Sequence, residues 1–161
     1  MFYAIRHSDS EHMKIEEEIH QNAFKDSWQK AYINLIFTAN WVQLRQAGLF
    51  KPYDLTLPQF NILRILRGQY PKPATVNMLI ERMLDKTSNA SRIVDKLEAK
   101  KLVTRTQCPN DRRTVDIVIT EKGLELLTQM DELSGSLLVG INNLSSEEAE
   151  QLSQLLDKVR G

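Results

Sequence analysis

Apolar residues recur at roughly helical spacing along the first part of the chain. The stretch from Ile15 to Gly48 contains no Pro and no earlier Gly, and its apolar positions include Trp28, Ile33, Ile36, Phe37, Val42 and Leu44. This pattern predicts one long amphipathic helix, or two helices in line, over residues 15–48. Gly48 is expected to end it, and residues 49–56, which include Pro52 and Asp54, are expected to form a connector.

Three shorter helices are predicted next from capping residues and apolar faces. Thr56 can cap the first, which Gly68 closes, and Thr75 can cap the second, which reaches about Arg82. The third is predicted over Thr87–Lys101. Their apolar faces consist of Phe60, Leu63 and Leu66, then Leu79 and Met83, then Ala90, Ile93, Val94 and Leu97.

The period then changes from helical to the alternation of two residues that is typical of β-strands. Val103–Gln107 leads into a turn at Cys108–Asp111, and Val115, Ile117 and Ile119 alternate with their neighbours on the return strand. No other segment of the sequence carries a convincing β pattern. These residues predict a two-stranded hairpin with a polar tip.

Two helices are predicted after the hairpin. Thr120 can cap one that runs to about Asn142, with Ile119 and Leu124 as a hydrophobic staple. Ser145 and Glu148 form a capping-box pattern for the last helix, whose apolar positions are Leu152, Leu155, Leu156 and Val159. The predicted fold is mostly α with a small β-hairpin wing, that is, a winged helix-turn-helix with further helices at both ends.

Composition limits the class of protein. The chain is 42% hydrophobic and 26% charged, as in globular proteins, and its 161 residues suit one domain, expected over residues 13–161. Met1–His12 shows no periodic pattern and is expected to be a leader derived from a cloning junction. No apolar run is long enough for a membrane span, so a cytoplasmic location is expected. The single Cys108 has no thiol partner for a disulfide.

Positive charge is concentrated in one segment of a neutral chain. Lys86–Arg113 holds eight basic and three acidic residues, a net charge of +5, so the remainder carries −5. A compact cationic unit is typical of proteins that bind nucleic acid, because neutralising phosphates releases condensed counterions. Double-stranded DNA is therefore the expected partner.

The predicted third helix has residues suited to the major groove. Ser88, Asn89 and Ser91 are small and polar at its start, and Arg92 has the fork geometry that recognises guanine. The alternative is that these residues only cap and solvate the helix. At the hairpin tip, Arg112 and Arg113 point to opposite faces, so one can enter a minor groove while the other meets a phosphate.

Several segments resemble the MarR (multiple-antibiotic-resistance regulator) family in order and spacing. They are Ser91–Glu98, Leu102–Val103, Asp111–Arg113, Ile119–Gly123 and Leu144–Glu148. The resemblance implies a triangular homodimer in which residues 15–48 and 121–161 form the dimerisation helices and residues 56–119 form the DNA-binding lobe. The family usually has a glycine before the first wing strand, where this chain has Lys101.

The same resemblance implies roles for individual residues. Arg113 is the expected minor-groove probe, held by Asp111, while Thr87–Arg92 face the major groove. The full expected DNA-binding set is Thr87, Ser88, Asn89, Ser91, Arg92, Lys96, Arg112 and Arg113. Many family members respond to small aromatic or phenolic ligands, for which Trp28, Phe37, Trp41 and Phe60 are candidates here, although such aromatics are more often plain core.

Other chemistry has little support in the sequence. There is no Gly-rich phosphate loop and no nucleophile–base set, so an enzyme is not expected. Neither a metal site nor a cofactor is expected, since only His20 remains outside the leader. The predicted function is a homodimeric, ligand-responsive repressor that binds a pseudo-palindromic operator. The alternative is a winged-helix protein-interaction module that does not bind DNA.

Overall fold

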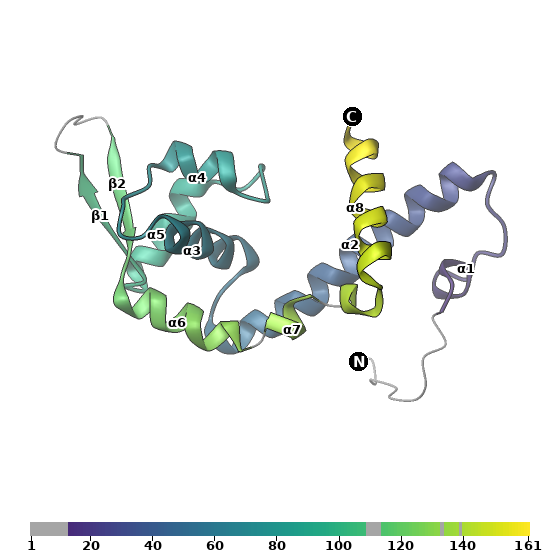
Figure 1. The fold of residues 1–161 in the computed structure, drawn as a ribbon, viewed down its shortest axis with the longest axis horizontal. Coiled ribbons are helices and arrows are strands. Elements are labelled where there is room, and N and C mark those ends of the chain that lie inside the picture. Colours follow the sequence, from purple (N-terminus) through teal and green to yellow (C-terminus); the bar gives the residue numbers. More distant parts are fainter. Residues whose placement is uncertain (1–12, 109–113, 133, 139) are drawn as a thin grey trace. The chain divides into compact units, whose positions relative to one another are not determined.

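The computed structural model describes residues 13–108, 114–132, 134–138 and 140–161 (Figure 1). The predicted leader Met1–His12 lies outside the described residues. The chain divides into two compact units, Met1–Val42 and Gln43–Gly161. In the described part, no helix is long and apolar enough to cross a membrane.

Two helices lie in the segment 15–48, so of the two predicted alternatives the single long helix was wrong. A short helix, α1 (Ile15–Glu18), is followed by irregular chain in which His20 has a φ of 53°. The main helix, α2, spans Ser27–Phe50. It begins there because the Asp26 carboxylate accepts a hydrogen bond from the Gln29 N–H at 2.8 Å, which caps the first turn.

The end of α2 also differs from the prediction. Gly48 lies inside the helix, which continues to Phe50 and passes into a 3-10 turn at Lys51–Tyr53. Phe50 is fully buried in the core, so packing extends the helix past the glycine. The turn ends at Asp54, whose φ of 50° redirects the chain.

The next two helices begin at the predicted caps. Helix α3 (Leu57–Gln69) starts with a capping box between Thr56 and Gln59, and α4 (Val76–Arg82) starts where the Thr75 hydroxyl accepts from the Met78 N–H at 3.2 Å. Helix α5 spans Ala90–Ala99 and so begins later than the predicted Thr87. Hydrogen bonds in the turn that precedes it delay its start.

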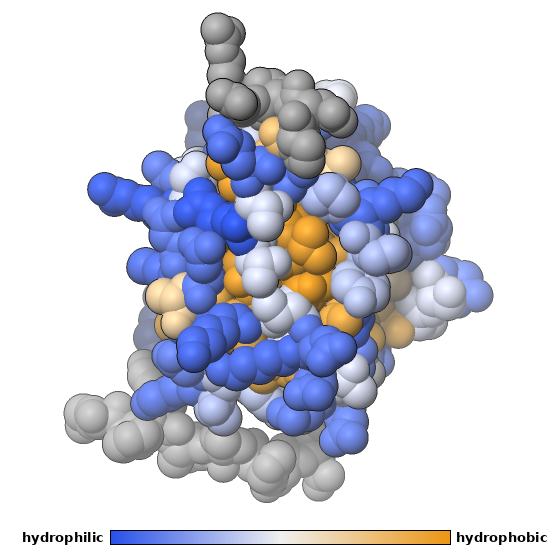
Figure 2. Space-filling model, turned by 90° about the vertical axis from the view of Figure 1, so that its left-hand side faces the viewer, coloured by the Kyte–Doolittle hydropathy of each residue, from blue (hydrophilic) through white to orange (hydrophobic). Residues whose placement is uncertain are grey.

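The hairpin confirms the predicted wing. Strands β1 (Val103–Gln107) and β2 (Val115–Ile119) are antiparallel, with Val103 opposite Ile119 and Gln107 opposite Val115. Ala74, between α3 and α4, exchanges two backbone hydrogen bonds of 2.9 Å with Ile117. This bridge attaches the hairpin to the helices. The side of the molecule shown in Figure 2, which carries the hairpin, exposes mostly hydrophilic residues around a smaller apolar area.

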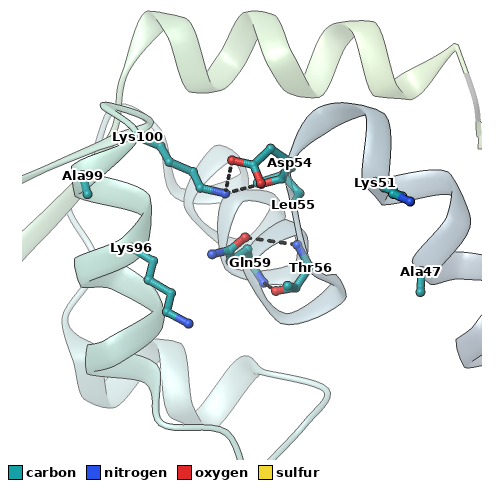
Figure 3. A pocket seen from close by; sticks show the side chains of 9 residues that line it. All are labelled: Ala47, Lys51, Asp54, Leu55, Thr56, Gln59, Lys96, Ala99 and Lys100. Atoms are coloured by element: carbon teal, nitrogen blue, oxygen red, sulfur yellow. Dashed lines mark hydrogen bonds and ion pairs between the residues drawn. The ribbon is translucent and has the colours of Figure 1, made fainter.

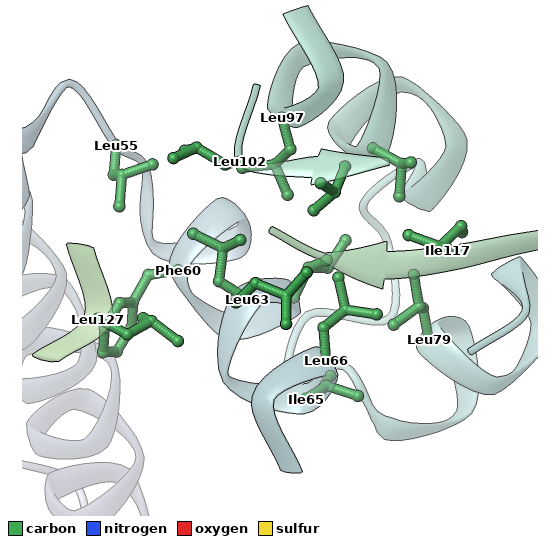
Figure 4. Packing of buried hydrophobic residues seen from close by; sticks show 14 of the residues in the cluster. Leu55, Phe60, Leu63, Ile65, Leu66, Leu79, Leu97, Leu102, Ile117 and Leu127 are labelled. Carbon is green, nitrogen blue, oxygen red and sulfur yellow. The ribbon is translucent and has the colours of Figure 1, made fainter. Parts of the chain in front are cut away.

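One core joins the helices and the hairpin of the second unit. Leu63 and Leu66 from α3 pack with Leu79, Leu97 and Ile117, and all five side chains are buried (Figure 4). The predicted apolar faces of the three helices meet in this cluster, which Leu127 of α6 (Glu121–Asp131) also joins. The mostly α winged helix-turn-helix fold is confirmed.

The C-terminal helices are more interrupted than predicted. Helix α6 spans Glu121–Asp131, α7 is the short Ser134–Leu137, a 3-10 turn covers Ile141–Asn143, and α8 spans Ser146–Arg160. The predicted single helix to Asn142 was therefore wrong. Gly135 and Gly140 weaken a helix in this stretch, and Gly140 adopts a φ of 78°. The predicted caps at Thr120 and Ser145 are confirmed.

Candidate nucleic-acid interface

The turn before α5 is ordered by one carboxylate. Asp85 accepts hydrogen bonds from the Ser88 hydroxyl at 2.5 Å, the Thr87 hydroxyl at 2.7 Å and the Thr87 N–H at 2.9 Å. These hydrogen bonds lower the pKa of Asp85 to about 2, and the one from the Ser88 hydroxyl has the largest effect. Thr87 and Ser88 therefore belong to a turn, and the prediction that placed them in the helix was wrong.

Asn89 supplies the cap that starts α5. Its side-chain oxygen accepts from the Arg92 N–H at 3.0 Å, so the first helical residue is Ala90. The signal was present in the sequence, because Asn is as good a cap as Thr, but three candidate caps stand in a row at residues 87–89. Only the contacts of Asp85 decide among them.

The exposed face of α5 brings together part of the predicted DNA-binding set. Ser91, Arg92 and Lys96 are exposed, while Ala90, Val94 and Leu97 are buried on the opposite face. Arg92 and Lys96 stand four residues apart and so lie on the same side of the helix, one turn from each other. The two cations therefore stand together on the solvent side of α5.

Three of the basic residues counted in the cationic segment bind within the protein. The Lys86 ammonium donates to the Ile80 and Glu81 carbonyls at the end of α4. Lys100 pairs with Asp54 at 3.0 Å. Arg105 pairs with two acidic residues of α5. Within the described chain, Arg92, Lys96 and Lys101 make no ion pair.

Backbone pairing between the two sides of the hairpin continues past the ends of the strands. Beyond the last strand pair, the Cys108 N–H donates to the Thr114 carbonyl at 3.0 Å. The predicted tip residues Asp111, Arg112 and Arg113 lie outside the described residues. Their roles remain predictions.

The candidate ligand-binding aromatics have different environments. Trp28 on α2 is 81% exposed, while Phe37 and Trp41 on the same helix are half-buried. Phe60 is only 9% exposed, and its ring centroid lies 5.0 Å from that of Phe50 in the core. Its ring therefore already has a packing partner.

The described residues contain no candidate metal site. No three His, Cys, Asp or Glu side chains there are grouped closely enough to hold an ion. Cys108 is half-buried and forms no disulfide.

Sequence reasoning missed two polar residues near α5. Asp85 carries a detectable signal, since an acidic residue before Thr-Ser is typical of a side-chain-stabilised turn. Gln59 also has a signal, because Thr56-x-x-Gln59 is a capping-box pattern. Its burial could not be foreseen.

Comparison with known proteins gives one consistent family. The model of the MarR family matches residues 55–115. The HTH-type transcriptional regulator MgrA of Staphylococcus aureus is 30% identical over 111 residues, which cover 69% of this chain and 74% of MgrA.

Solved structures agree with this match. A mutant of MarR from E. coli, solved in complex with operator DNA, is 28% identical, with a TM-score of 0.66 over 78% of this chain and 91% of that one. AbsC of Streptomyces coelicolor, a MarR family transcriptional regulator, shares the fold at 20% identity and a TM-score of 0.74, over 86% of this chain and 96% of its own. The chain therefore belongs to the MarR family, as a DNA-binding transcription regulator and not an enzyme.

Proposed function

We propose that the chain acts as a homodimer that binds a pseudo-palindromic operator and represses transcription by occluding the promoter. The observation that carries the proposal is the exposed pair Arg92 and Lys96, which lie one helical turn apart on α5. Asp85 orders the chain just before this helix. In this proposal Arg92 contacts a base and Arg113, held by Asp111, enters the minor groove. Thr87, Ser88 and Ser91 approach the DNA around Arg92.

Exposed apolar side chains support the homodimer. On α8, Leu155 is 61% and Val159 is 71% exposed. On α2, Trp28 and Tyr32 are also largely exposed. Apolar groups gathered on two helices are typical of an interface that another chain covers. We assign dimerisation to residues 15–48 and 121–161, and DNA binding to residues 56–119.

Selection of bound sequences from a random duplex pool tests the proposal. The expected result is a pseudo-palindrome whose half-sites lie roughly 10 base pairs apart, bound by a dimer in sedimentation. Arg92→Ala should relax the base preference at one position by about 1–3 kcal/mol. Arg113→Ala should weaken binding, while Lys14→Ala, at an exposed residue outside the assigned segments, is the control for the loss of one charge.

The protein-interaction alternative makes the opposite prediction. A module that does not bind DNA would show no steep fall of duplex affinity with rising salt, whereas a regulator that neutralises phosphates would. A chain that stays monomeric, or that ignores every duplex in dilute buffer, contradicts the proposal.

We further propose that a small aromatic or phenolic ligand releases the DNA. A cavity of about 360 Å³ lies beside the turn before α5, with Leu57, Pro58, Leu84 and Asp85 among its lining residues. A ligand bound there favours one position of α5, and it shifts DNA binding only by its differential affinity for the two states. Titration of the operator complex with phenol and with benzoate tests this. An unchanged DNA affinity at saturating concentrations of both probes contradicts it.

A further inference from the structure

A second cavity lies between the start of α3 and the C-terminal half of α5. Its volume is about 650 Å³, and it is open to solvent on one side. The polar side chains that line it include Lys51, Asp54, Gln59, Lys96 and Lys100 (Figure 3). The base contacts and the aromatic ligand proposed above leave this cavity without a role.

Gln59 presents an unused donor to the cavity. It is 4% exposed, and it is the one buried polar side chain in the described part of the chain. Its side-chain oxygen accepts from the Thr56 N–H at 3.0 Å, and its own N–H donates to the Thr56 hydroxyl at 3.4 Å. The side-chain Nε2 has no partner among the described residues, and it points into the cavity (Figure 3). Because Nε2 is not enclosed, it is free to donate to water or to a ligand in the cavity that accepts hydrogen bonds.

The charges around Gln59 favour an anion. Lys96 lines the cavity and has no ion pair among the described side chains. Lys100 forms an ion pair with Asp54 at 3.0 Å. Asp54 is the one carboxylate among the lining residues, so this pair neutralises it. Lys51 adds a second positive charge, and the N-terminus of α3 has the positive end of the helix dipole.

We infer that this cavity binds a phosphate group through Gln59 Nε2 and the Lys96 ammonium, and that the phosphate belongs to the DNA backbone. The inference rests on the proposed function. Lys96 lies one turn after Arg92 on the exposed side of α5, so DNA held by Arg92 passes the mouth of the cavity. A contact of this kind sets the register of the protein on the duplex and does not discriminate between bases.

Gln59→Glu is the decisive substitution. It keeps the side-chain oxygen that accepts from Thr56, and replaces the donor amide with a second anionic oxygen. The chain already uses Glu in this way, since Glu148 accepts from the Ser145 N–H at 2.8 Å in the capping box of α8. The start of α3 should therefore be preserved, which a thermal melt can verify, while a phosphate is repelled.

The expected result is a loss of about tenfold in affinity for every duplex, with an unchanged base preference and a salt slope lower by about 1. Lys96→Gln should show the same pattern more weakly. The same exchange at the other end of α3, Gln69→Glu, lies outside the cavity lining; it is the matched control and should leave affinity unchanged. Equal DNA affinity of the wild-type and Gln59→Glu proteins overturns the inference, although the proposed function would stand.

A second measurement separates the two sources of phosphate. The side-chain amide resonance of Gln59 is followed in the free protein during titration with inorganic phosphate, against chloride at equal ionic strength, and then with duplex DNA. A shift with DNA supports the assignment to the backbone, with or without a weaker shift from phosphate. A shift with phosphate alone, while wild-type protein binds DNA normally, overturns that assignment. Failure of the wild-type protein to bind any DNA would contradict the proposed function itself.

Discussion

The Arg105 guanidinium on β1 forms an ion pair with the Asp95 carboxylate on α5. Glu98, one turn further along α5, lies 3.6 Å from the same guanidinium. The first strand of the wing is thereby tied to the solvent side of the helix that carries Arg92. This tie orients α5 and the wing relative to each other, and it engages Arg105 within the protein.

A double-mutant cycle measures this tie. Arg105→Met and Asp95→Asn should each lower stability slightly, with a coupling of about 0.2–1 kcal/mol because the pair is partly exposed. The coupling should shrink in high salt. Urea denaturation of the four proteins gives the value, and additive effects at low salt would show that the pair contributes nothing.

Gly123 is required by a close approach of backbone. A Cβ placed there would lie 2.5 Å from the Leu102 carbonyl oxygen and 2.7 Å from Ile119 Cγ1. Gly123→Ala should therefore lower the free energy of unfolding by about 1–3 kcal/mol. Gly48→Ala is the control, since Gly48 lies in helix α2 with nothing within 4 Å, and it should raise stability by about 0.4–1 kcal/mol. Equal effects of the two substitutions in chemical denaturation would contradict this account.

Lys101 occupies a backbone conformation that favours glycine. Its φ is 61°, between the end of α5 and the start of β1. A left-handed conformation costs a residue with a side chain about 1–2 kcal/mol, so Lys101→Gly should raise the free energy of unfolding by about 1 kcal/mol. Lys101→Val should lower it, because β-branched residues tolerate this region least. A less stable glycine variant in urea would show that the Lys101 side chain matters more than its backbone.

The Asp85 turn predicts a pH dependence. The pKa of Asp85 falls from its ordinary value to about 2 when the chain folds, so its contribution to stability is present above about pH 4 and is lost as the pH falls toward 2. Ser88→Ala removes the largest cause and should raise the Asp85 pKa toward its ordinary range. Ser91→Ala, which leaves these hydrogen bonds in place, should not. A carbon-detected NMR titration of the carboxyl group checks both, and an unshifted pKa in Ser88→Ala would contradict the assignment.

Local signals in the sequence were sufficient where one residue dominates a short segment. Thr56, Thr75, Thr120 and Ser145 each cap the helix that the pattern assigned to them. The hairpin was also predictable, because the apolar residues of β2 recur with a period of two, which is typical of a strand and not of a helix. In these places the cap or the alternating period leaves one favourable backbone conformation.

Predictions failed where local signals compete. Thr87, Ser88 and Asn89 can each cap α5, and the hydrogen bonds of Asp85 select Asn89. Gly48 suggests a helix end, but burial of Phe50 carries α2 past it. The first outcome depends on which local hydrogen bonds form among several candidates, and the second depends on tertiary packing.

By itself, the sequence determined the order of helices and hairpin, the cationic segment and the residues of the MarR resemblance, because periodicity, capping and charge are local properties of a chain. Only the tertiary structure decided that Arg105 and Lys100 serve internal ion pairs, and that the Gln59 amide faces a cavity beside Lys96. The physical reason is that side chains acquire partners through packing, and packing joins residues that are far apart along the chain.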